Sequence, residues 1–335
     1  MDLRQQQLTQ WLQTDCNKTI VMLTPMAGDA SFRRYFRVHA DSQSWIAMDA
    51  PPERENNTNA FIAIARSLAA LGARVPEIIN ADSTRGFLLL SDFGDHVYLR
   101  ELTADNADTL YANAMTTLAN LQACRDIRDW PLPVFTAEFM YKELQTFKEW
   151  FLQKHLNLDL SASTEAMLAD YFSFLAETSA AQPQVFMHRD YHSGNLMVLP
   201  DHEVGVLDFQ DAFIGPITYD LVSLLRDCYI SWPPANVRKW ALQFHAGIPA
   251  LENINQATFM RWFDVMGMQR HLKALLTFSR KFHRDGNANY LWHIPRTLDY
   301  VANVAPHHPE CAAFADFLDE TIIPTLAKVT AICVE

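Results

Sequence analysis

The feature that most constrains this chain is a polar loop followed by a short apolar hairpin near its middle. Residues 188–195 read His-Arg-Asp-Tyr-His-Ser-Gly-Asn, so the carboxylate of Asp190 precedes the amide oxygen of Asn195 by five positions. Two apolar runs flank a Pro-Asp-His-Glu turn at 200–203 and predict a β-hairpin that ends at Asp208. Because a hairpin returns its second strand to the start of its first, we expect Asn195 and Asp208 to lie side by side.

Hard oxygen ligands together with a separate carboxylate are what phosphoryl transfer requires. Mg²⁺ prefers carboxylate and amide oxygens, while a further carboxylate orients the attacking hydroxyl group and accepts its proton. The pattern H-R-D-x-x-x-x-N with a later metal-binding Asp is typical of kinases. We therefore predict that Asp190 is the catalytic base and that Asn195 and Asp208 hold Mg²⁺, with ATP as the phosphate donor. The alternative, three ordinary surface or cap residues, requires their spacing to be accidental.

Composition limits the other functions open to the chain. Its 335 residues suit one bilobal unit or two domains, and 49% hydrophobic residues supply sizeable cores. The 39 acidic residues outnumber 27 basic ones without any basic block, so we expect neither nucleic acid nor a membrane as a partner. Five scattered cysteines without a C-x-x-C pair indicate reduced thiols, and the polar N-terminus predicts no signal peptide. We expect a soluble, cytoplasmic protein with no obligate protein partner.

The order of helical and strand-like segments predicts an α+β chain of two lobes. Hydrophobic periodicity before residue 92 indicates strands around one helix at 57–71, preceded by a helix at 3–12. The expected strands are 20–23, 34–38, 45–48, 77–80 and 87–90. The expected helices that follow are 105–124, 137–155, 161–181, 219–226, 235–245, 258–282 and 312–332. We assign residues 1–91 to a small nucleotide-binding lobe and residues 92–335 to a larger catalytic and substrate-binding lobe.

The polar loop resembles that of the aminoglycoside phosphotransferase-like kinases, whose bilobal fold is similar to that of eukaryotic protein kinases. His192 supplies the second histidine of the H-x-D-x-H-x-x-N pattern that is typical of this family. Residues 215–221, Gly-Pro-Ile-Thr-Tyr-Asp-Leu, also match it, and the resemblance implies that Asp220 braces the catalytic loop through hydrogen bonds. A second interpretation, compatible with the first, is an acidic residue favoured by the dipole at a helix N-terminus.

Longer strings resemble one branch of this family, which phosphorylates the anomeric hydroxyl group of the amino sugars N-acetylmuramate and N-acetylglucosamine. The matching strings lie at 28–38, 48–53, 188–197, 215–227, 269–273 and 294–298. The resemblance implies transfer of the ATP γ-phosphate to the sugar C1 hydroxyl group, in cell-wall recycling. The alternatives are a kinase for another hydroxylated small molecule, such as an aminoglycoside, choline or an amino alcohol, and a nucleotide-binding pseudokinase.

Nucleotide contacts are expected from the small lobe. The loop at 28–36 resembles the family's phosphate-positioning loop, where backbone amides and a serine hydroxyl group meet phosphates; an ordinary hairpin turn would also explain its glycine. The Asp-Phe-Gly at 92–94 precedes the catalytic loop by roughly a hundred residues, so we interpret it as a hinge beside the adenine instead of a metal motif. The predicted nucleotide-binding residues are Gly28, Ser31, Phe32, Arg34, Leu90, Ser91 and Asp92.

The strand at 45–49 departs from the kinase pattern. A kinase places there a lysine that binds the α- and β-phosphates, whereas this strand reads Trp-Ile-Ala-Met-Asp. We hypothesise that an arginine of the preceding strand, Arg34 or Arg37, supplies the missing positive charge. The alternative is that the arginines form a solvated edge of the sheet.

Substrate contacts are expected beyond Asp208. The segment at 262–273 mixes apolar residues with Arg, His and Lys, and aromatic residues nearby suit stacking on a sugar ring. A core helix with one solvated face is the alternative for each of its residues. Its cationic side chains predict a neutral or anionic substrate. The predicted substrate-binding residues are His192, Asp211, Arg226, Asp227, Tyr229, Arg270 and His271.

Overall fold

A computed structural model describes the chain except for residues 1, 27–32, 41–42, 55–57, 125 and 333–335. The chain forms two compact units, the first made of Met1–Leu132 with Gly194–Ala212, and the second of Pro133–Ser193 with Phe213–Glu335. Asn195 and Asp208 therefore belong to the first unit, whereas Asp190 belongs to the second. The predicted lobe boundary after residue 91 divides the chain by function and stays a prediction.

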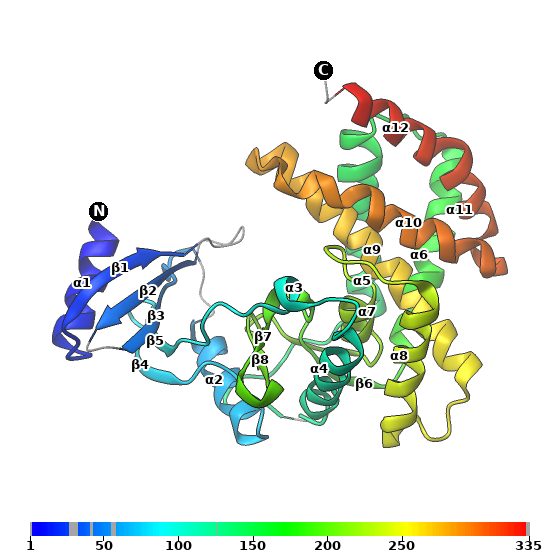
Figure 1. The fold of residues 1–335 in the computed structure, drawn as a ribbon. Coiled ribbons are helices and arrows are strands. Elements are labelled where there is room, and N and C mark those ends of the chain that lie inside the picture. The colour runs from blue at the N-terminus through cyan, green and yellow to red at the C-terminus, as the bar shows by residue number, and fades with distance from the viewer. Residues whose placement is uncertain (1, 27–32, 41–42, 55–57, 125, 333–335) are drawn as a thin grey trace. The chain divides into compact units, whose positions relative to one another are not determined.

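The first unit is built on an antiparallel sheet of five strands in its described part. The strands follow one another across the sheet in the order β1 (Ile20–Pro25), β2 (Arg34–Ala40), β3 (Gln43–Asp49), β5 (Phe87–Ser91) and β4 (Ile78–Asp82) (Figure 1). Phe36 pairs with Ala47, and Ala47 with Leu89, so alternation places all three on one face. Helix α1 (Leu3–Thr14) buries Trp11 against that face, which gives the sheet its core.

The hairpin that follows the catalytic loop has the predicted form. Strands β7 (Leu196–Val198) and β8 (Val204–Val206) pair antiparallel across a 3₁₀ turn at Pro200–His202. The backbone amide of Leu207 donates to the carbonyl group of Asn195 at 3.0 Å, which closes the hairpin at its open end. The other helices of this unit are α2 (Thr58–Ala70), α3 (Tyr98–Glu101) and α4 (Ala107–Gln122).

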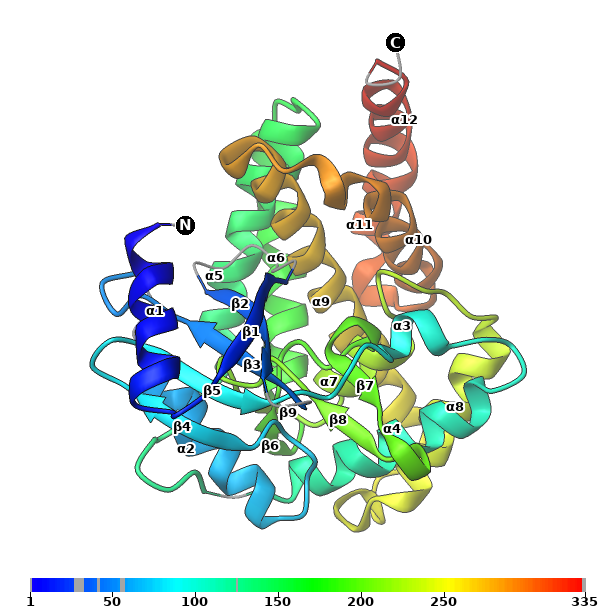
Figure 2. The same ribbon diagram turned by 60° about the vertical axis from the view of Figure 1, so that its left-hand side comes forward.

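The second unit is mainly helical and is organised around α9 (Gln256–Asp285), a helix of 30 residues (Figure 2). Helices α5, α6, α7 and α10 all pack against α9. A two-stranded sheet of β6 (Gln184–Met187) and β9 (Phe213–Pro216) leads into the catalytic loop. The helices are α5 (Ala137–Phe147), α6 (Ala162–Ala180), α7 (Tyr219–Leu225), α8 (Pro234–Gly247), α10 (Ile294–Val304), α11 (Ala312–Phe317) and α12 (Ile323–Ile332), with π-helical turns at Lys148–His155 and Leu318–Ile322.

These elements confirm the predicted α+β class. The expected strands of the small sheet and the expected long helices are present, with ends that differ by a few residues. The short strands β6 and β9 and the helices α3 and α10 were not predicted. Among the described helices, none is both long enough and apolar enough to cross a lipid bilayer. Cys16, Cys124, Cys228 and Cys311 are free thiols.

Candidate active site

The catalytic loop begins where β6 ends and is fixed by a carboxylate of α7. Asp220, which is buried in the first turn of that helix, accepts hydrogen bonds from the amides of His188 at 2.7 Å and Arg189 at 3.0 Å. Arg189 adopts a φ of 75°, a left-handed conformation that costs energy for a residue with a long side chain. Asp220 therefore braces the loop, as the resemblance implied, and stabilises its strained backbone one residue before Asp190.

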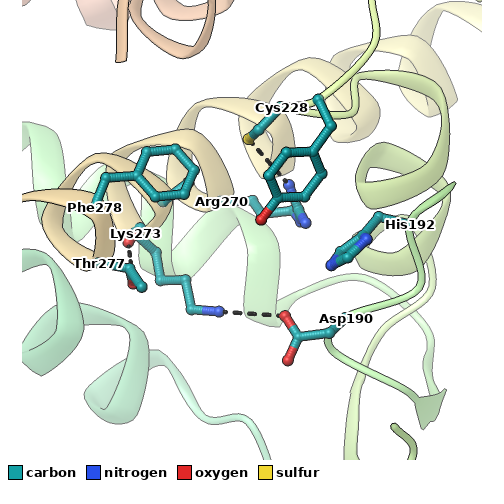
Figure 3. A pocket seen from close by; sticks show the side chains of 9 residues that line it. Asp190, His192, Cys228, Arg270, Lys273, Thr277 and Phe278 are labelled. Atoms are coloured by element: carbon teal, nitrogen blue, oxygen red, sulfur yellow. Dashed lines mark hydrogen bonds and ion pairs between the residues drawn. The ribbon is translucent and has the colours of Figure 1, made fainter. Parts of the chain in front are cut away.

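Asp190 lies in a pocket of the second unit (Figure 3). Its carboxylate is 3.7 Å from the ammonium group of Lys273, and the two side chains point toward one another. His192 lies on the same loop, and its ring contacts that of Tyr229 at 5.2 Å between centroids. The residues that line the pocket are Asp190, His192, Cys228, Tyr229, Arg270, Lys273, Ala274, Thr277 and Phe278.

One face of α9 supplies the floor of this pocket. Its lining residues Arg270, Lys273, Ala274, Thr277 and Phe278 stand at positions i, i+3, i+4, i+7 and i+8, which is the pattern of one helix face. Four of them, Lys273, Ala274, Thr277 and Phe278, were not among the predicted substrate-binding residues. Helical periodicity counted from Arg270 would have identified them, since Lys273 follows it by three positions and Thr277 by seven.

The charges around Asp190 keep its carboxyl group ionised. Desolvation by itself would raise the pKa of Asp190, but the positive charges of Lys273, Arg189 and Arg270 hold that pKa well below its usual range. A carboxylate of this kind accepts a proton reluctantly and accepts hydrogen bonds readily. It is thus suited to orienting a hydroxyl group that loses its proton late in the reaction.

The first unit brings together the two predicted metal ligands. The amide nitrogen of Asn195 lies 3.5 Å from Oδ2 of Asp208, and Gln210 donates to Oδ1 of Asp208 at 2.8 Å. Asp208 has a φ of 62°, and its side chain is 42% exposed. No group of three or more His, Cys, Asp or Glu side chains forms a metal site in the described residues. One amide and one carboxylate oxygen nevertheless fit Mg²⁺, because this ion is commonly held by few protein ligands together with phosphates and water.

Several predicted substrate residues lie outside the pocket lining. Asp227 is buried and accepts hydrogen bonds from the amides of Ser193 at 3.0 Å and Tyr229 at 2.8 Å. Arg226 donates to Asp264 at 2.6 Å, and its carbonyl group accepts a hydrogen bond from Nε2 of buried His271 at 2.9 Å. These three predicted residues do not line the pocket, although Asp227 holds the backbone of Tyr229, whereas His192, Tyr229 and Arg270 line it. Asp211 belongs to the first unit.

The predicted nucleotide-binding residues are placed less completely. Gly28, Ser31 and Phe32 lie outside the described residues. Leu90 is buried in β5. The backbone amide of Glu77 donates to the hydroxyl group of Ser91 at 2.9 Å, and the backbone amide of Ser91 donates to the carbonyl group of Glu77 at 2.9 Å. The carboxylate of Asp92 binds Arg37 at 2.7 Å and the amide of Gly94 at 2.9 Å. Asp92 therefore holds the connector after β5 in place, and its predicted position beside the adenine stays a prediction.

The loop, the hairpin and the kinase-like order of elements define a phosphotransferase, and comparison with known families agrees. Residues 23–253 match the phosphotransferase enzyme family (APH), and the chain belongs to this family. It is therefore an enzyme that transfers phosphate to an alcohol group, as the sequence motifs predicted.

Particular relatives share nearly the whole length of the chain. It is 40% identical over 334 residues to an N-acetylmuramate/N-acetylglucosamine kinase of Pseudomonas putida, covering 95% of this chain and 97% of that protein. The enzyme of the same name from Pseudomonas aeruginosa is 39% identical over 332 residues, covering 95% of this chain and 96% of that protein. The one from Neisseria meningitidis is 37% identical over 329 residues, covering 95% and 96% respectively.

Solved structures share the fold at low sequence identity. Choline kinase LicA from Streptococcus pneumoniae superimposes with a TM-score of 0.65 at 11% identity, covering 89% of this chain and 99% of that one. Aminoglycoside 2'-phosphotransferase-IIIa, as a GDP complex, gives a TM-score of 0.63 at 16% identity, covering 90% and 99%. These similarities confirm the predicted protein-kinase-like fold and carry no information about the substrate.

Proposed function

We propose that the chain is an ATP-dependent sugar kinase that phosphorylates the anomeric C1 hydroxyl group of N-acetylmuramate, N-acetylglucosamine or both. The observation that carries this proposal is the pocket in which Asp190 lies beside Lys273, with Arg270, His192 and Tyr229 around it. The names of the relatives at 37–40% identity point to the same two sugars. The product, a sugar 1-phosphate, would serve cell-wall recycling in the cytoplasm.

The chemistry assigned to the pocket needs only a weak base. An anomeric hydroxyl group is more acidic than an ordinary alcohol, so it is deprotonated with little assistance. Asp190 accepts a hydrogen bond from this hydroxyl group and directs its oxygen toward the γ-phosphate, and positioning supplies most of the rate enhancement. Tyr229 offers an aromatic face to the sugar ring, while Arg270 and Lys273 suit a carboxylate such as the lactyl group of N-acetylmuramate.

The metal and the nucleotide are assigned to the first unit. Asn195 and Asp208 would hold Mg²⁺, which neutralises charge on the phosphates when it is bound. The backbone from Leu90 to Asp92 is the proposed contact for adenine.

Two other functions compete with this proposal. A kinase for choline, an amino alcohol or an aminoglycoside would bind a cation, and Arg270 and Lys273 in the pocket oppose that by charge repulsion. A nucleotide-binding pseudokinase would need no base, yet Asp190, Asn195 and Asp208 are all present. We therefore favour the amino-sugar kinase.

A coupled assay of ADP release tests the proposal directly. N-acetylmuramate and N-acetylglucosamine should each be offered beside choline, ethanolamine and an aminoglycoside, with Asp190→Asn as the inactive control. We expect turnover with at least one of the two sugars, and a phosphorus NMR signal of a C1 phosphate in the product. Turnover with the cationic substrates alone, or phosphate on another hydroxyl group, would contradict the proposal.

A further inference from the structure

The strand in which a kinase carries its phosphate-binding lysine ends in this chain with an acidic residue instead. Asp49 ends β3 with no exposed surface, and its carboxylate accepts hydrogen bonds from Nε of Arg4 at 2.9 Å and Nε of Arg34 at 3.0 Å. An acidic side chain held by two arginines offers no positive charge to a nucleotide. A residue other than Asp49 would then have to supply this charge.

The two arginines that the sequence suggested are both held by carboxylates. Arg34 also binds Asp2, which caps the N-terminus of α1. Arg37 binds Asp92 at 2.7 Å, Asp95 at 2.8 Å and the carbonyl group of Gly94 at 3.0 Å. These contacts join β2 to α1 and to the connector after β5, so Arg34 and Arg37 have structural partners.

The preceding residue, Arg33, has a different environment. It lies immediately before β2, and only 7% of its surface is exposed. Its Nη2 atom is 3.3 Å from Asp211 and 4.0 Å from Asp208, the proposed metal ligand. Gln210 donates to the same two carboxylates, at 2.8 Å to Asp208 and 3.2 Å to Asp211. A nearly buried guanidinium group is thus directed at the carboxylate that would hold the metal.

We propose that Arg33 binds the phosphates of the nucleotide and replaces the missing strand lysine. Two neighbouring carboxylates repel one another, and the single positive charge of Arg33 offsets part of this repulsion in the free protein. A divalent cation held at Asp208 would take over this neutralisation, which leaves the guanidinium N–H groups of Arg33 to donate to phosphate oxygens. Arginine suits this role because it is always charged and presents several donors in a planar fork.

The inference deepens the proposed kinase function, and its test concerns the nucleotide alone. Dissociation constants of ADP, AMP and adenosine should be measured by calorimetry with Mg²⁺, for the wild type and for Arg33→Met, Arg33→Lys and Arg74→Met. Arg74 is the matched control, because it belongs to the same unit and pairs with Glu203 at the surface. We expect Arg33→Met to weaken ADP about tenfold or more, as loss of a charged hydrogen bond does.

Adenosine lacks phosphates, so we expect its affinity to change less than twofold in every variant. Arg33→Lys keeps the positive charge but lacks the planar guanidinium group, so it should weaken ADP binding less than Arg33→Met does. If Arg33→Met does not fold, Arg33→Lys is the variant that tests the proposal. Equal weakening of ADP and adenosine would mean that Arg33 is only a structural counter-ion of Asp211, and unchanged ADP affinity would exclude it as a phosphate contact. Because no sugar is present, failure of the sugar-kinase proposal would appear separately in the ADP-release assay.

Discussion

The ammonium group of Lys273 lies 3.7 Å from the carboxylate of Asp190, although the two residues come from helix α9 and from the catalytic loop. The side chain of Lys273 is 19% exposed, so solvent screens this attraction only partly. Desolvation lowers the pKa of Lys273, whereas Tyr219 and Asp190 raise it, and the net shift is upward. Lys273 therefore stays charged and holds Asp190 in its ionised form.

Replacing Lys273 should change catalysis and its pH dependence together. We expect Lys273→Met to lower kcat about a hundredfold, since it removes a fixed charge beside the reacting group. Without that charge the pKa of Asp190 rises, so the acidic limb of the pH–kcat profile should move to higher pH. The exposed Lys142, paired with Glu138 one turn away, supplies a control in Lys142→Met. An unshifted acidic limb with a reduced kcat would show that Lys273 acts in some other way.

Asp190→Asn tests the catalytic carboxylate without altering the shape of the pocket. We expect kcat to fall about a thousandfold, within the range for loss of a general base. Because neighbouring positive charges stabilise the ionised carboxylate in the folded protein, the variant should also unfold at a somewhat lower temperature, and kcat should be measured well below that temperature. ADP affinity should stay that of the wild type. Near-normal turnover would contradict the role assigned to Asp190.

Asp208→Asn tests metal binding in the first unit. Asparagine tolerates the φ of 62° at this position, so the hairpin should remain folded. The wild type should bind ADP more tightly when Mg²⁺ is added, and we expect the variant to lose most of this gain because a neutral amide holds Mg²⁺ less strongly than a carboxylate. Asp105→Asn, at an exposed position, is the control. A full Mg²⁺ effect in the variant would exclude Asp208 as a ligand.

Contacts between residues close in sequence could be predicted here, whereas contacts between residues far apart in sequence could not. Asn195 and Asp208 were placed correctly because a hairpin closed by a short turn joins them. Arg33 was not connected to Asp211 because the two are 178 positions apart, and no local pattern links them. Strands β6 and β9 have four residues each, too few for an alternation to be recognised.

Lys273 is an intermediate case. The sequence does not show its tertiary contact with Asp190. Helical periodicity does, however, place Lys273 on the same helix face as Arg270. Conversely, the mixture of charged and apolar residues in this segment suggested His271 as a substrate contact. The structure buries His271 outside the pocket lining, because the residue next to Arg270 points in another direction around the helix.

Asp227 should matter for stability more than for sugar affinity. Its buried carboxylate accepts hydrogen bonds from the amides of Ser193 and Tyr229. An asparagine would present its NH₂ group to at least one of these donors, so that hydrogen bond would be lost. We expect Asp227→Asn to lower the free energy of unfolding by about 1–3 kcal/mol, measured with urea. Asp299→Asn, exposed on α10, is the control. A raised KM for the sugar at unchanged stability would instead favour the direct substrate contact predicted from the sequence.

His271 should make the folded state sensitive to acid. The ring is buried, donates to the carbonyl group of Arg226 and stacks on Tyr300. Burial and the neighbouring charge of Arg270 lower its pKa from 6.5 to about 3. Between these two values the unfolded chain binds a proton that the folded chain does not, so the free energy of unfolding falls as the pH is lowered from 6.5 to about 3.

His271→Gln keeps a donor for Arg226 and does not titrate. The free energy of unfolding should be measured with urea at a series of pH values. We expect it to depend less steeply on pH in this variant than in the wild type, by up to about 1.4 kcal/mol per pH unit. The control is His307→Gln, at an exposed position, which should show the same pH dependence as the wild type. If His271→Gln also shows the wild-type pH dependence, His271 is already protonated in the folded protein.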